Sequence, residues 1–170
     1  MKNNKGYSLI ELMVVISIAS ILILGSVSAV RILTFSNTVK ITQTIDSQIS
    51  KNRLLTMSKG NYRYIAIDWN STKEEYEISM VSSSTVLNTT NWKSSGTIET
   101  NKKLASKDVT ISYQNGVSAT PVMVKDVTLL ISNNPSTGAF VSSVTQINIA
   151  SSSKSSTIYM VTKTGKHYIE

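Results

Sequence analysis

The longest apolar run in the chain restricts its fold more than any other feature. It extends from Leu12 to Val30, and Arg31 closes it. At about 1.5 Å per residue, a helix of this length roughly matches the ~30 Å hydrocarbon core of a membrane. We therefore expect an apolar transmembrane helix over about residues 12–30.

A carboxylate, Glu11, directly precedes this run. A charge inside a membrane span costs about 2.5–3.5 kcal/mol on the most lenient insertion scale, so it needs a cationic partner and hydrogen bonds. A secretory signal peptide would have a shorter apolar run and a small-residue cleavage site. A plain membrane anchor fits the length of the run but leaves Glu11 unexplained.

The string GYSLIEL at residues 6–12 resembles the class III signal of type IV pilins and pseudopilins. The resemblance implies that residues 1–6 are a leader peptide and that prepilin peptidase cuts between Gly6 and Tyr7. Tyr7 would then be N-methylated; it replaces the usual phenylalanine but keeps an aromatic ring. Glu11 would be the fifth residue of the mature chain and would pair, during assembly, with the N-terminal ammonium of a neighbouring subunit.

The helical pattern continues beyond the apolar run. Ile41, Ile45 and Ile49 recur every four residues, with Lys40 and Asp46 among the polar residues of the opposite face. The same apolar face is expected to include Phe35, Val39, Leu54 and Leu55. Glycine 60 after Lys59 is a typical helix stop. We expect one helix over residues 7–59.

Residues 60–170 show the alternation typical of strands and form the predicted globular head. Segments 62–69 and 76–80 predict a hairpin, and further strands are expected at 108–113, 122–131, 145–150, 157–163 and 166–169. The serine-rich stretches 82–85 and 151–156 are interpreted as exposed loops. The predicted class is α+β: a long N-terminal helix, with an apolar transmembrane half and an amphipathic half, packed on an antiparallel β-sheet head.

The C-terminal part of the head resembles the H-type minor pseudopilins and related minor pilins. The resemblance is carried by LLISNNPSTGAF, QINIA and IYMVTKTGKHYIE, with Pro135, Gly138, Gly165 and Lys166 at matching places. It covers the last 40 or so residues, whereas the pilin signal covers the first 35. Residues 70–120 resemble nothing specific.

The net charge of +7 is concentrated in the leader and in residues 31–59. The alternative to a purely structural role is a DNA-binding minor pilin that contacts nucleic acid through Lys154, Lys163, Lys166 and His167. Such binding would weaken steeply with salt. A dense basic cluster interleaved with aromatic residues, the stronger indication of nucleic-acid binding, does not occur in the sequence.

The sequence offers little for catalysis. It has no cysteine and one histidine, His167, so a zinc site lacks its ordinary ligand set, and no metal or cofactor is expected. No glycine-rich phosphate loop is present. Asn70-Ser71-Thr72 and Asn88-Thr89-Thr90 match glycosylation sequons, a pattern common by chance in so Asn/Ser/Thr-rich a chain. We do not expect an enzyme.

The favoured function is that of a structural subunit, a minor pilin or pseudopilin, of a type IV filament used for pilus assembly, type II secretion or DNA uptake. Its expected partners are prepilin peptidase, other subunits through the N-terminal helix, a membrane-embedded assembly platform and the lipid bilayer, with DNA as the alternative partner. It would lie in the cytoplasmic (inner) membrane as a single-pass protein with its head outside the cytoplasm, and in the pilus or pseudopilus after assembly. A membrane-anchored extracellular adhesin or enzyme is the third hypothesis.

Overall fold

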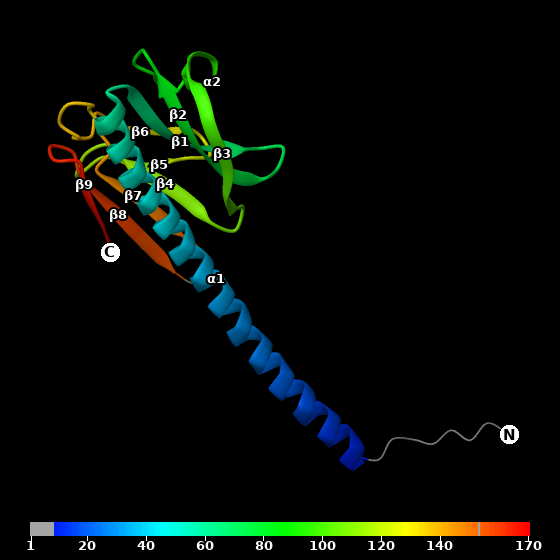
Figure 1. The fold of residues 1–170 in the computed structure, drawn as a ribbon. Coiled ribbons are helices and arrows are strands. Elements are labelled where there is room, and N and C mark those ends of the chain that lie inside the picture. The colour runs from blue at the N-terminus through cyan, green and yellow to red at the C-terminus, as the bar shows by residue number, and fades with distance from the viewer. Residues whose placement is uncertain (1–8, 153) are drawn as a thin grey trace.

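The computed structural model describes residues 9–152 and 154–170, and for residues 24–36 it describes the backbone alone. A long helix, α1 (Leu9–Lys59), packs with its C-terminal part on a β-rich head and extends away from the head with its N-terminal part (Figure 1). The strands of the head pair in antiparallel fashion. The predicted α+β class is confirmed.

The C-terminal part of α1 buries one stripe of its surface. Ile45 and Ile49 are fully buried, and Asn52 and Thr56 continue the same stripe. The prediction that Leu54 belongs to the buried face is therefore wrong, since its side chain is 70% exposed. At 3.6 residues per turn, steps of three and four lead from Ile49 to Asn52 and Thr56, whereas a step of five leaves the stripe.

Val39 and Leu55 are half-buried, while the side chain of Phe35 lies outside the described residues. At the end of α1, Gly60 adopts φ +68° and its N–H donates to the carbonyl of Thr56 at 3.1 Å. This left-handed residue ends the helix and turns the chain into the first strand.

One sheet contains four strands in the order β3-β2-β1-β6. These are β1 (Tyr62–Asn70), β2 (Glu75–Ser83), β3 (Thr97–Ser106) and β6 (Leu129–Ser132). The predicted hairpin is β1–β2, in which Asp68 pairs with Glu77 and Ile67 with Ile78.

The other sheet contains five strands in the order β5-β4-β7-β8-β9. These are β4 (Thr110–Gln114), β5 (Val122–Met123), β7 (Gln146–Ala150), β8 (Ser155–Val161) and β9 (Lys166–Ile169). The single strand expected over 122–131 is wrong, because it divides into β5 and β6 of different sheets. The amides of Asp126 and Val127 both donate to the carbonyl of Met123, which turns the chain between the sheets.

The serine-rich stretches are not simply exposed loops. Ser82 and Ser83 end β2, and Ser155 and Ser156 begin β8. Ser156 is buried and pairs with Ile149. A serine donates and accepts backbone hydrogen bonds as any other residue does, so composition alone does not exclude it from a strand.

The main core lies between α1 and the inner faces of both sheets, and it includes Ile45, Ile67, Ile111, Ile147 and Ile158. A smaller core lies on the outer face of the first sheet, where Leu87 and Trp92 pack against β1 and β2. Trp92 belongs to the short helix α2 (Trp92–Ser95). The sequence indicated neither α2 nor β3.

Candidate functional site

The N-terminal part of α1 presents apolar side chains on every side. Over residues 9–23 the large apolar side chains are at least half exposed, for example Leu9 at 77% and Ile21 at 70%. The head covers none of this surface, whereas one stripe suffices to hold the C-terminal part of α1 on the head. A helix that is apolar all round needs lipid or other apolar helices around it.

The two serines of this segment are compatible with an apolar environment. The hydroxyls of Ser17 and Ser20 donate to the backbone carbonyls of Met13 and Ile16, each at 2.8 Å. Their polar groups are thus satisfied within the helix itself, which an apolar environment requires.

Glu11 is the acidic residue of the first turn of α1, and its side chain is exposed on the same segment. Gly6 and Tyr7, the residues of the predicted cleavage and N-methylation, lie outside the described residues. The predicted span 12–30 includes residues 24–30, whose side chains also lie outside them. In the part of the chain that the structure describes, no helix has the length and apolarity needed to cross a membrane.

The structure does not gather the four C-terminal residues predicted to contact DNA. Lys154 precedes β8 and Lys163 follows it, so the seven residues of β8 separate them by about 20 Å. Lys163, on the β8–β9 turn, and Lys166, the first residue of β9, are both exposed. His167 does not belong to that surface, because its side chain is 9% exposed and faces α1. The basic residues therefore form a pair and not a patch.

His167 connects the last strand to the long helix. Its Nε2 lies 3.1 Å from Oδ1 of Asp46 and 3.3 Å from Oγ of Ser50, while Nδ1 is buried without a hydrogen-bond partner among the described residues. In a serine–histidine–aspartate triad the serine and the acid bind opposite ring nitrogens. Here both lie beside Nε2, so this geometry is that of a packing contact.

A second polar group lies on the outer face of the first sheet. The carboxylate of Glu77 accepts hydrogen bonds from Lys73 at 2.8 Å, Asn101 at 2.9 Å and Asn70 at 3.0 Å. These donors, Lys73 foremost, lower the pKa of Glu77 to about 2 despite its burial. Three donors around one ionised acid hold neighbouring strands together and leave no acid poised for proton transfer near neutral pH.

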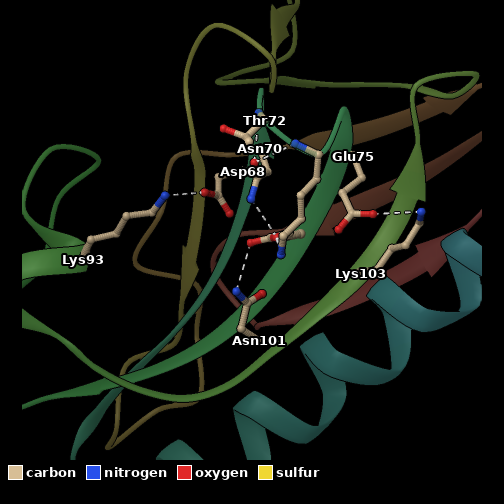
Figure 2. Close-up of polar contacts among 9 residues, drawn as sticks. Asp68, Asn70, Thr72, Glu75, Lys93, Asn101 and Lys103 are labelled. Atoms are coloured by element: carbon tan, nitrogen blue, oxygen red, sulfur yellow. Dashed lines mark hydrogen bonds and ion pairs between the residues drawn. The ribbon is translucent and has the colours of Figure 1, made fainter.

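Ion pairs surround this group, as Figure 2 shows. Lys93 of α2 reaches Asp68 at 2.7 Å, and Lys103 of β3 reaches Glu75 at 2.8 Å. Both carboxylates are largely buried whereas both ammonium groups are exposed. Among the described residues, no group of three His, Cys, Asp or Glu side chains is placed to hold a metal ion. The arrangement indicates a structural role.

Two polar residues that attach α1 to the head, Asn52 and Arg53, were not predicted from the sequence. The amide of Asn52 donates to the carbonyl of Arg63 at 3.2 Å and to Asn133 at 3.4 Å. Arg53 donates to the carbonyl of Thr164 at 3.1 Å. The available signal was the position of Asn52, three residues after Ile49 on the buried stripe.

Residues 1–27 match the family model described as the prokaryotic N-terminal methylation motif. No curated protein and no solved structure has significant similarity to the chain. The match supports a relationship to the type IV pilin-like proteins and indicates a structural subunit that prepilin peptidase processes. It covers the start of the chain and does not test the H-type resemblance of the head.

Proposed function

We propose that the chain is a minor pilin or pseudopilin, a structural subunit of a type IV filament. One observation carries the proposal: a methylation motif over residues 1–27 includes the start of a helix whose apolar side chains are exposed on every side over residues 9–23. A surface of this kind is suited to lipid before assembly and to like helices after it. In such a filament the same helix–helix contact repeats from one subunit to the next without closing into a ring, and this repetition propagates the filament.

The chemistry of the N-terminus gives Glu11 its role in this proposal. Cleavage after Gly6 creates an ammonium group at Tyr7, and N-methylation keeps the positive charge. Glu11 pairs with that ammonium on a neighbouring subunit. The carboxylate is costly in an apolar environment when alone and is compensated when paired, so it favours the docked subunit over the isolated one.

In the proposed topology, residues 12–30 cross the cytoplasmic membrane and the head lies outside the cytoplasm. The uncharged run between Glu11 and Arg31 supports this assignment. A membrane-embedded assembly platform then moves the subunit from the bilayer into the filament.

The resemblance of two head loops to the H-type minor pseudopilins supports a minor rather than a major subunit. Pro135 and Gly138, two of the residues that resemble the H-type pattern, lie on the loop between β6 and β7. The other two are Gly165, on the β8–β9 turn, and Lys166, which begins β9. The loops meet, since the amide of Phe140 donates to the carbonyl of Thr162 at 3.0 Å. The resembling residues thus form one structural unit.

The intact mass of the protein from its native membrane, with and without active prepilin peptidase, tests the proposal. We expect loss of residues 1–6 and one added methyl group on Tyr7 when the peptidase is active, and the full chain when it is not. A full-length mass under both conditions would overturn the assignment.

A pair of variants then tests assembly. Glu11→Ala should enter the membrane normally but be absent from sheared filaments, because the partner of the ammonium is lost. Ser17→Ala is the matched control on the same segment, since the Ser17 hydroxyl bonds within its own helix. It should be found in filaments as the wild type is. Normal filament entry by Glu11→Ala would contradict the proposed role of Glu11.

A further inference from the structure

The loop after β4 contains Asn115-Gly116, the one Asn-Gly pair in the sequence. In such a pair the glycine nitrogen can attack the side-chain carbonyl carbon of the asparagine. A C–N bond forms, ammonia leaves, and water then opens the five-membered succinimide to aspartate or isoaspartate. Glycine hinders the attack least, because it has no Cβ. The side chain of Asn115 is exposed to the water that the second step needs.

The backbone explains why a glycine stands at this vulnerable position. Gly116 has φ +110°, a conformation that residues with a side chain rarely adopt. A Cβ added there would meet no atom within 4 Å, so packing does not require glycine. The turn thus places the dipeptide most prone to deamidation on an exposed loop.

Thr145, which directly precedes β7, holds the reactive nitrogen. The N–H of Gly116 donates to Oγ1 of Thr145 at 3.2 Å, and that hydroxyl donates in turn to the carbonyl of Gln114 at 3.3 Å. The backbone amide of Thr145 donates to the same carbonyl at 2.9 Å. Because the hydroxyl proton is directed at Gln114, a lone pair of the oxygen faces Gly116.

We infer that Thr145 protects Asn115 from deamidation by occupying the N–H of Gly116. The attack requires the nitrogen to lose its proton and to turn toward the Asn115 side chain. A neutral hydroxyl accepts the hydrogen bond without removing the proton, and it keeps the peptide plane in place. The reaction then proceeds only from openings of the loop in which this hydrogen bond is broken.

Deamidation at this loop would change the charge of a defined surface. Val117, two residues after Asn115, is 88% exposed and lines a hollow of about 400 Å³ together with Tyr159, Lys163 and Tyr168. A new carboxylate at position 115 would place a negative charge beside it. Thr145 therefore preserves the charge of this face during the lifetime of the folded subunit.

Four versions of the full chain in detergent test the inference: wild type, Thr145→Val, Thr145→Ser and Thr157→Val. They are incubated at mildly alkaline pH, and deamidation is followed by mass spectrometry of the tryptic peptide 108–125. This peptide contains Asn115 and has the same sequence in all four versions. We expect Thr145→Val to accelerate deamidation about five- to tenfold, the factor that corresponds to loss of one hydrogen bond.

The other two variants separate protection from general loosening. Thr145→Ser keeps the hydroxyl and should deamidate at nearly the wild-type rate, and Thr157→Val, an equal change on the same sheet, should do likewise. The unfolded chain in urea gives the upper limit of the rate. Equal rates for wild type and Thr145→Val would overturn the inference, as would equal acceleration by Thr157→Val, or a folded wild-type rate already at the urea limit.

Discussion

Gly165 lies against Gly138 so closely that a side chain on Gly165 would overlap the carbonyl oxygen of Gly138. Both residues have positive φ, +67° and +68°, and the side chain of Arg53 from α1 lies beside both. Two loops and the end of the long helix therefore meet at a point where the backbones must approach directly.

Gly165→Ala should destabilise the head through both conformation and overlap. A left-handed residue with a Cβ costs about 1–2 kcal/mol, and the overlap with backbone atoms adds a similar amount. Gly60→Ala is the matched control, since Gly60 has φ +68° but open space around it. Thermal unfolding of both variants should show the larger loss for Gly165→Ala, and equal losses would mean that the contact with Gly138 adds nothing.

Glu77 should make the stability of the head sensitive to acid. Its pKa is lowered from 4.5 to about 2 in the folded state, so its stabilising contribution is present above pH 4.5 and is lost as the pH falls toward 2. With allowance for solvent screening, the loss is about 1–2 kcal/mol. Urea unfolding of wild type and Glu77→Gln at pH 7 and pH 2.5 checks this: the difference between them should shrink at the lower pH. A constant difference would contradict it.

Removal of Lys93 should cost more than removal of Lys107. Lys93→Met leaves the largely buried carboxylate of Asp68 without its cation, at a cost of about 1–3 kcal/mol. Lys107 pairs with Glu74, whose side chain is 60% exposed, so solvent screens this pair and Lys107→Met should change stability little. Chemical denaturation measures both, and the reverse order would show that burial of Asp68 does not decide the effect.

Ile45→Ala tests the buried stripe of α1. Ile45 is fully buried in the main core, so the cavity should reduce the free energy of unfolding by about 2–5 kcal/mol. Leu54→Ala, a similar loss of volume on the same helix, should change it by less than about 0.5 kcal/mol because Leu54 is exposed. Denaturant unfolding followed by tryptophan fluorescence separates the two, and a comparable loss for Leu54→Ala would contradict this orientation of α1.

The strands that alternate strongly in sequence were predicted well. Strand β7 is an example, because Ile147 and Ile149 are buried and Asn148 between them is exposed, a period of two that the sequence displays directly. By contrast, β3 was missed. It lies at an edge of its sheet with most of its side chains exposed, so its position depends on hydrogen bonds to β2 and leaves little apolar pattern to read.

The features of the candidate site also divide into those that the sequence displays and those that depend on the tertiary structure. The sequence by itself determined the methylation motif, the charge at Glu11 and the apolar run, since signals and helix periodicity are local properties of the chain. Only the tertiary structure decided that His167 faces Asp46, that Asn52 is buried, and that Thr145 reaches Gly116. These contacts join residues far apart in the chain. The packing of α1 against two sheets and the pairing of β4 with β7 bring them together at distances that no local pattern encodes.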